Sequence, residues 1–274
     1  MATQITSRFA GHGDACVNGG VRSDSRNQEG GHDACHDPRT TETTIGEVYD
    51  NFADSYENTI EETRLRSFQR EVFAQFPHHG FTLDLGSGTG VVGMLIRQSP
   101  LNASSTQSRV YVHGVDVSTR MLNTPWCVRY YDSTQQGFIQ DILMDPDASW
   151  LQQAVQPGAA QSCSVSGPAV DHITCFGALH FLSPKQFEAA LSRMFVLARR
   201  SVMFDIDDIC PFYMQYILEK LGEGFRNYNH MAAYRKFGTP PGWVKVVEEE
   251  AVLYHSPNVG VDMRGVLVRF ERVE

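Results

Sequence analysis

The chain has 274 residues, enough for one or two domains of ordinary size and for one sizeable hydrophobic core. Its 42% hydrophobic and 11% aromatic residues exclude wholesale disorder, a collagen-like repeat and a coiled coil. Its net charge of −9 argues against a broad basic surface, so we expect neither a nucleic-acid partner nor a membrane partner.

Residues 1–42 are predicted to be a disordered leader, because they are poor in apolar residues and show no helical or strand periodicity. The leader lacks the apolar segment of a secretory signal, and no apolar run of about 20 residues follows, so we expect a cytoplasmic protein. Two related segments in it, GHGDAC and GHDACH, supply possible metal ligands, but their spacing fits no established zinc site. We therefore favour low complexity over a metal site at His12, Cys16, His32, Cys35 and His36.

Residues 43–274 are predicted to form a single domain that opens with two amphipathic helices over residues 43–76. Strands and helices then alternate, as the periodicity and the turn residues between segments indicate. The predicted strands are residues 81–86, 109–116, 137–141, 170–179 and 199–207, and the predicted helices are residues 88–98, a segment starting near 118, 184–198 and 211–221. Residues 243–256 and 261–273 break the alternation and predict an antiparallel hairpin at the sheet edge.

This alternation predicts an α/β fold with a mostly parallel sheet and helices on both faces. In such a sheet, ligands bind at the carboxyl ends of the strands, near the point where the strand order reverses. The residues that follow each predicted strand are therefore the ones to examine for function.

A glycine-rich loop, Asp84-Leu85-Gly86-Ser87-Gly88-Thr89-Gly90, follows the first predicted strand. Glycines at alternate positions let the backbone turn tightly and approach a ligand closely. The spacing matches a D-x-G-x-G-x-G loop more closely than the G-x-G-x-x-G dinucleotide fingerprint. Gly93 does complete a G-x-G-x-x-G pattern that begins at Gly88. The loop alone therefore does not exclude a dinucleotide.

Carboxylates at the ends of the next strands favour one ligand. Asp116 ends the second predicted strand and can accept hydrogen bonds from both ribose hydroxyls of an adenosine. Asp141, at the end of the third, can accept a bond from the adenine amine while Ile142 offers apolar surface, and Asp84 can meet a cationic amine. A pyrophosphate would be repelled by these three carboxylates, so the ligand that fits is S-adenosylmethionine. Each Asp taken alone is equally compatible with a helix cap or a turn.

TLDLGSGTG, GVDVS, FIQDI and CFGALHFL together resemble the class I S-adenosylmethionine-dependent methyltransferases over residues 43–274. The resemblance implies a Rossmann-like, seven-stranded sheet whose last strand is antiparallel. It implies that the methionine part contacts Asp84, Gly86, Ser87 and Gly88, and that Asp116 with Val117 and Asp141 with Ile142 hold the adenosine. It also implies that Phe176 lies near the sulfonium and that residues 43–76 form a lid in which Tyr49 or Tyr56 closes over the cofactor. More loosely, the chain is similar to small-molecule tailoring methyltransferases of fungal specialised metabolism.

An acceptor that must lose a proton needs a base, and His180 is the candidate because a histidine pKa lies near working pH. A structural role for this imidazole remains the alternative. Asp205, Asp207 and Asp208 have oxygens that suit magnesium, but we favour solvated or capping carboxylates and predict no metal. The aromatic insertion at about residues 209–243 is expected to contact a small-molecule acceptor through Tyr213, Tyr228 and His230.

Two other functions remain open at this point. One is a methyltransferase-like cyclase or rearrangement catalyst that does not consume the cofactor, and the other is a non-catalytic partner subunit that binds it. The sequence does not specify the acceptor or the oligomeric state.

Overall fold

The computed structural model describes residues 38–60, 63–75, 80–103, 110–145, 170–222, 225–256 and 259–273. The possible metal ligands of the leader lie outside these residues. The helices are α1 Pro38–Phe52, α2 Tyr56–Ile60, α3 Arg64–Gln75, α4 Val91–Gln98, α5 Pro100–Ala103, α6 Thr119–Leu122, α7 Pro125–Tyr130, α8 Ile139–Met144, the 3₁₀ helix η1 Leu179–Phe181, α10 Pro184–Leu197, α11 Pro211–Leu221 and α12 Met231–Phe237. The strands are β1 Phe81–Leu85, β2 Tyr111–Asp116, β3 Ser133–Gln136, β4 Val170–Cys175, β5 Ala198–Asp208, β6 Trp243–Ser256 and β7 Val261–Arg272.

The described strands form one seven-stranded sheet in the order β3-β2-β1-β4-β5-β7-β6. Strands β1 to β5 pair in parallel, whereas β7 runs antiparallel to both β5 and β6. This confirms the predicted Rossmann-like, mostly parallel sheet and its antiparallel hairpin. The strand order reverses at β1, which has β2 on one side and β4 on the other, so the expected ligand position is the carboxyl end of β1.

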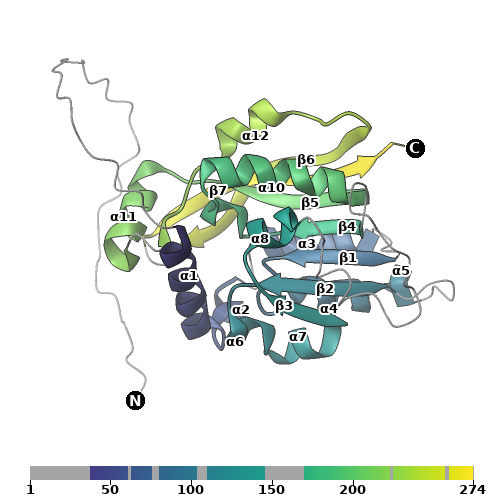
Figure 1. Ribbon diagram of the computed structural model, residues 1–274, viewed down its shortest axis with the longest axis horizontal. Coiled ribbons are helices and arrows are strands. Elements are labelled where there is room, and N and C mark those ends of the chain that lie inside the picture. The colour runs from purple at the N-terminus through teal and green to yellow at the C-terminus, as the bar shows by residue number, and fades with distance from the viewer. Residues whose placement is uncertain are drawn as a thin grey trace. The chain divides into compact units, whose positions relative to one another are not determined.

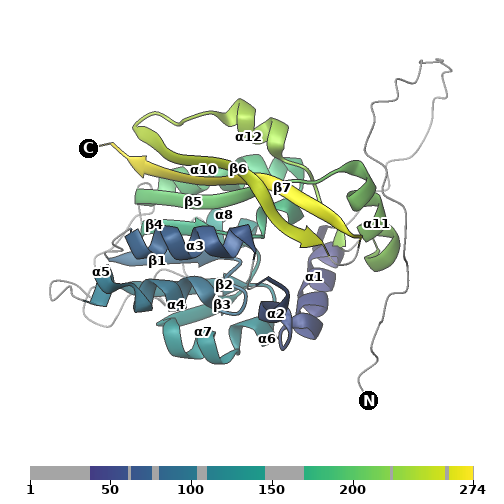
Figure 2. The ribbon, with the colours of Figure 1, turned by 180° about the vertical axis from the view of Figure 1, so that it is seen from behind.

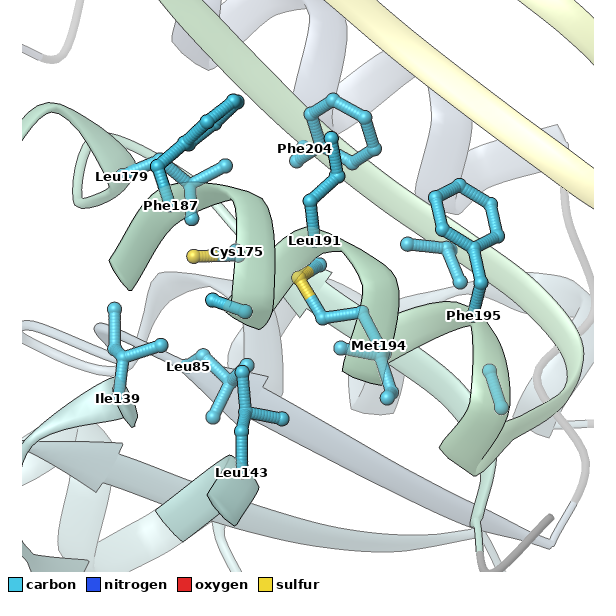
Figure 3. Packing of buried hydrophobic residues seen from close by; sticks show 14 of the residues in the cluster. Leu85, Ile139, Leu143, Cys175, Leu179, Phe187, Leu191, Met194, Phe195 and Phe204 are labelled. Carbon is cyan, nitrogen blue, oxygen red and sulfur yellow. The ribbon is translucent and has the colours of Figure 1, made fainter. Parts of the chain in front are cut away.

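Helices cover both faces of the sheet, as predicted. Helices α8 and α10 lie over the face seen in Figure 1, and α3 and α4 lie over the opposite face seen in Figure 2. Figure 3 shows the packing of α10 on the sheet. Phe187, Leu191 and Met194 of this helix point toward the sheet residues Leu85 and Cys175. These side chains are fully buried, so the core fixes the strand ends that carry the site.

The helical region before β1 differs from the expectation in number and start. Among the described residues, three helices rather than two precede β1, and α1 begins at Pro38, inside the segment expected to be leader. Its apolar residues include Ile45, which is buried. Helix α1 therefore reaches further toward the N-terminus than its apolar periodicity indicated.

The predicted third strand at residues 137–141 is wrong. Strand β3 is Ser133–Gln136, and Ile139–Met144 is the helix α8. The apolar residues of FIQDILM recur at helical spacing and pack on the core through Ile139, Ile142 and Leu143. Strand β3 is polar because it is the sheet edge and alternates between half-buried and exposed residues, so its sequence carries no apolar strand signal.

None of the described helices has both the length and the apolar character needed to cross a bilayer.

Candidate functional site

The glycine loop turns sharply between β1 and α4. Gly86, Gly88 and Gly90 have φ angles of 70°, 51° and 97°, a region that residues with a Cβ rarely adopt. A Cβ on Gly86 would lie 2.6 Å from the Cβ of Ala178, and one on Gly90 would lie 2.7 Å from the backbone nitrogen of Cys127. Gly86 and Gly90 are therefore required by their close approach to neighbouring segments, whereas Gly88 has open space beside it and is favoured by its positive φ.

The loop is joined directly to the carboxylate that ends β2. Gly88 N–H donates a 2.8 Å hydrogen bond to Oδ2 of Asp116, and Ser118 N–H donates a 2.9 Å bond to Oδ1. Ser87 N–H donates to the carbonyl of Val115 at 2.9 Å. Burial raises the pKa of Asp116 to about 6, in spite of the backbone donors that favour its charged form. The structure thus brings together the two elements that the sequence assigned to one cofactor.

Asp84 is a buried residue of β1 and not an exposed strand-end carboxylate. Its Oδ2 accepts a 2.6 Å hydrogen bond from the Tyr131 hydroxyl, and its Oδ1 accepts a 2.6 Å bond from Oγ1 of Thr174. Burial raises its pKa to about 7, and the nearby charge of Asp116 contributes in the same direction. Each carboxylate oxygen of Asp84 therefore already has a hydroxyl donor. The sequence analysis did not identify Tyr131 and Thr174 as these donors.

Tyr131 explains the third glycine of the dinucleotide-like spacing. A Cβ on Gly93 would lie 2.3 Å from the Tyr131 ring, and one on Gly114 would lie 2.7 Å from the same ring. Gly93 N–H also donates to the Tyr131 hydroxyl at 3.1 Å. Gly93 therefore makes room for a tyrosine that positions Asp84, so its presence in the motif does not require a dinucleotide.

One buried polar atom of the loop has no hydrogen-bond partner among the described residues. It is Oγ of Ser87, whose residue is 7% exposed. A bare-backbone turn, a carboxylate at the end of β2 and an unpartnered hydroxyl fit a ligand with an adenosine and polar substituents. These residues are therefore compatible with S-adenosylmethionine.

The other residues expected to contact the adenosine are Asp141, Ile142 and Val117. Because residues 139–144 form α8 and not a strand, Asp141 and Ile142 lie on a different element from the one predicted. Asp141 is exposed in the first turn of α8, whereas Ile142 is buried in the core. Val117 lies under α1, because a Cβ on Gly46 would be 3.1 Å from its carbonyl oxygen. That oxygen also accepts a 3.0 Å bond from Nε2 of Gln136. Val117 thus remains beside Asp116 and the first helix, while Asp141 belongs to a different element from the one predicted.

Tyr49 and Tyr56, from α1 and α2, meet edge to face with their ring centroids 6.0 Å apart. Tyr49 also lies 5.9 Å from the rings of both Phe181 and Phe225. Burial raises the pKa of Tyr56 to about 12, and it raises that of Tyr49 well above the usual value, with the charge of Asp116 adding to both. Both tyrosines are half-buried and lie within the electrostatic range of Asp116.

Helix α1 is fastened beside this region by Asp50. Its Oδ1 accepts hydrogen bonds from the Ser118 hydroxyl and from Arg120 N–H, the latter at 3.0 Å. Asp54 adds a 2.7 Å ion pair with the Arg120 guanidinium. Ser118 also donates its backbone N–H to Asp116. This one residue therefore connects α1 to the carboxylate expected to bind the cofactor. No sequence motif indicated Asp50.

A second link joins α2 and α3 to the glycine loop. The Thr89 hydroxyl donates a short hydrogen bond to Oε1 of Glu57, and Glu57 pairs with Arg66 at 2.8 Å. Arg66 is 6% exposed and also donates to Gln69 at 2.5 Å. A contact between a helix and a loop that are far apart in the sequence is not visible in a single sequence, so this link was also missed.

His180, the candidate base, lies next to a carboxylate from another strand. Its Nδ1 is 2.6 Å from Oδ2 of Asp207, the penultimate residue of β5. Asp205, on the same face of β5, accepts a 2.7 Å bond from Gly177 N–H. Burial and the charge of Asp207 raise the pKa of Asp205 to about 7. The structure therefore forms a His–Asp pair from residues that the sequence analysis considered separately.

The possible magnesium ligands have other contacts. Asp208 accepts a 2.8 Å bond from Nδ2 of Asn229, whereas Asp205 and Asp207 face Gly177 and His180. Within the described parts of the chain, no three His, Cys, Asp or Glu residues gather in a way that could hold a metal ion.

Of the predicted acceptor residues, Tyr228 and His230 lie together with ring centroids 6.1 Å apart, whereas Tyr213 lies in a different cluster. Tyr213 packs in the apolar cluster of α1, α11 and β7, and Tyr228 N–H donates to the His180 carbonyl at 2.8 Å. His230 stacks on Phe187 with ring centroids 4.1 Å apart, and its Nε2 donates to the Leu182 carbonyl at 2.9 Å. Burial lowers the pKa of His230 to about 4. This imidazole is therefore part of the core packing.

Phe176 is buried and packs edge to face on Phe68 and Phe73 of α3, at centroid distances of 6.3 Å and 6.5 Å. Its ring thus contacts the helical layer, and the backbone that follows it carries Gly177 and Ala178 past the glycine loop.

No protein-family model matches the sequence, and no curated protein matches it. Solved structures do match the fold. An S-adenosylmethionine-dependent methyltransferase from Anabaena variabilis is 13% identical with a TM-score of 0.54, and the match covers 84% of this chain and 94% of that chain. The 1,6-didemethyltoxoflavin-N1-methyltransferase of Burkholderia thailandensis, with bound 1,6-didemethyltoxoflavin and S-adenosylhomocysteine, is 11% identical with a TM-score of 0.52, over 92% and 94% of the two chains. At these identities the likeness establishes a common fold.

Proposed function

We propose that this protein transfers a methyl group from S-adenosylmethionine to a small-molecule acceptor. The observation that carries the proposal is the hydrogen bond from Gly88 N–H to Asp116, which joins the bare glycine loop to the acidic end of β2. The methyltransferase fold of the structural neighbours supports it. A role in specialised metabolism rests on the loose sequence resemblance alone.

This geometry supports a set of cofactor contacts. Asp116 with Val117 binds the ribose and adenine, and the backbone of Gly86 and Gly88 with the Ser87 hydroxyl binds the methionine part. Asp84 contributes negative charge from beneath the loop while Tyr131 and Thr174 hold its carboxylate. Tyr49 and Tyr56 close the region from the α1 and α2 side, and Asp141 remains a candidate adenine ligand from α8.

The bound cofactor supplies an electrophilic methyl group, so no nucleophilic residue of the protein is required. The protein orients the acceptor and excludes water, and such positioning contributes roughly 7–11 kcal/mol in favourable cases. His180 takes the acceptor's proton, and Asp207 orients the imidazole and stabilises its charged form. The segment with α11 and α12 borders the acceptor.

The test is incubation of the protein with methyl-labelled S-adenosylmethionine and a small-molecule extract of its own source cells. Label in a small product supports methyl transfer, and the product mass identifies the acceptor. Binding of the cofactor without label transfer would favour the cyclase or partner-subunit alternatives and contradict the proposal.

A further inference from the structure

Asp207 is a buried carboxylate that lacks well-aligned hydrogen-bond donors. The residue is 3% exposed, and neither of its oxygens has an aligned donor among the described residues. Its close contact is with Nδ1 of His180, at 2.6 Å. Its two oxygens can accept more bonds than His180 alone supplies, so Asp207 is suited to a ligand that brings donors or positive charge.

Aromatic rings lie around His180, the histidine that pairs with this carboxylate. The His180 and Phe181 rings are 4.2 Å apart, and Phe181 is 5.0 Å from Phe225, which also contacts Tyr49. The charge of Asp207 contributes to the raised pKa of Tyr49, so this ring lies within its electrostatic range. A buried carboxylate paired with a histidine that is itself bordered by aromatic rings is an arrangement suited to an ammonium group.

The position in the sheet separates this carboxylate from the cofactor candidates. Asp116 and the glycine loop lie at β2 and β1, whereas Asp207 is on β5, on the far side of β4. Two strand spacings separate β1 from β5, about 10 Å. The cofactor cation would lie near the loop, so the carboxylate on β5 is available to the acceptor.

We propose that the methyl acceptor is a protonated amine, held by Asp207 and the neighbouring rings and deprotonated by His180. This inference rests on the proposed methyl transfer and specifies its substrate class. Asp205, two residues earlier on the same face of β5, adds a second buried carboxylate to this region. A carboxylic acid acceptor would add another negative charge and be repelled.

The reaction balances in charge and atoms. The ammonium gives one proton to His180, and the lone pair that remains on nitrogen forms the new N–C bond to the methyl carbon. The C–S bond breaks with its electron pair going to sulfur, which becomes the neutral thioether of S-adenosylhomocysteine. Asp207 then faces an imidazolium in place of an ammonium, so one positive charge stays near it during proton transfer.

The experiment titrates the full chain, saturated with S-adenosylhomocysteine, with each of three probes by calorimetry at pH 8. The probes share a 4-hydroxyphenyl ring and differ in the polar group of the side chain. Tyramine carries an amine, tyrosol a hydroxyl and 4-hydroxyphenylacetate a carboxylate. We expect tyramine to bind at least tenfold more tightly than the other two. Asp207→Asn should reduce the preference to less than threefold, whereas Asp208→Asn, at the exposed neighbour, should retain it.

Equal binding of the three probes, tighter binding of the acid, or absence of tyramine binding would overturn the amine assignment. An unchanged preference in Asp207→Asn would also overturn it. The melting temperature of each variant shows whether it has folded. The preference of the wild type among the three probes tests the amine assignment even if a variant does not fold. If the wild type fails to bind S-adenosylhomocysteine, the proposed function itself fails, which is a distinct result.

Discussion

The hydroxyl of Tyr131 donates a 2.6 Å hydrogen bond to Asp84 and accepts one from the Gly93 N–H, so one phenol joins β1 to the start of α4. We expect Tyr131→Phe to reduce the free energy of unfolding by about 1–3 kcal/mol, because a buried carboxylate loses a donor. Denaturant unfolding measures this change. Tyr130→Phe is the matched control, since the bond that this hydroxyl makes within the described residues is an exposed one from Gln98. Equal stability of the two variants would contradict the role of Tyr131.

Asp116→Ala should weaken binding of S-adenosylhomocysteine by about 1.5–3 kcal/mol, because the ribose loses a charged acceptor. Calorimetric titration gives the affinity directly. Asp262→Ala removes an exposed carboxylate of the β6–β7 hairpin that pairs with His255, and should leave the affinity unchanged. An unaffected affinity in Asp116→Ala would eliminate the ribose role.

Cofactor binding should depend on pH through two buried carboxylates. The pKa of Asp84 is raised to about 7 and that of Asp116 to about 6, so both are partly protonated in the unliganded protein near neutrality. A cationic ligand favours their charged forms, so its affinity should rise between pH 5.5 and pH 8 with release of protons. Titrations in buffers of different ionisation enthalpy measure that release. A flat profile with no proton release would contradict the charge pairing.

The same pKa shifts lower the stability of the unliganded protein as the pH rises, whereas the cofactor affinity rises. Between about pH 4 and pH 7 the folded chain binds more protons at Asp84 and Asp116 than the unfolded chain does, because the folded pKa values are higher. Their contribution to stability is therefore greatest below the unfolded pKa and is lost as pH rises through the folded values.

The sequence predicted the glycine loop, Asp116 and the sheet because these signals are local: a turn motif, a strand end and an apolar period. It failed at β3, whose polar edge residues resemble a loop, and therefore placed Asp141 on the wrong element. The pairing of His180 with Asp207 joins segments far apart in the chain. Single-sequence patterns contain no information on such contacts, and Asp50 was missed for the same reason.

Asp50 should hold α1 in place over the end of β2. In Asp50→Ala, Ser118 and the Arg120 N–H lose their acceptor, so we expect faster proteolysis within α1 and a stability loss of about 1 kcal/mol. Asp54→Ala removes an exposed ion pair with Arg120 and serves as the comparison, because such pairs contribute little. Equal proteolysis rates in both variants would show that Asp50 does not fasten the helix.

His180→Ala should lower turnover of the acceptor found in the extract by about 10²–10⁴, which is the usual contribution of a general base. The cofactor affinity should stay close to that of the wild type, because the imidazole pairs with β5 and not with the glycine loop. His255→Ala, which removes an exposed histidine paired with Asp262 at 2.9 Å, is the matched control. Full turnover in His180→Ala would remove proton abstraction from the mechanism.

Titration of the unmodified protein with S-adenosylhomocysteine is the most direct test of the cofactor assignment. The loop between β1 and α4, joined to Asp116 through Gly88, predicts one site per chain with micromolar affinity. Absence of binding across pH 6 to 8 would contradict the assignment of this loop and of Asp116, and with it the proposed methyl transfer.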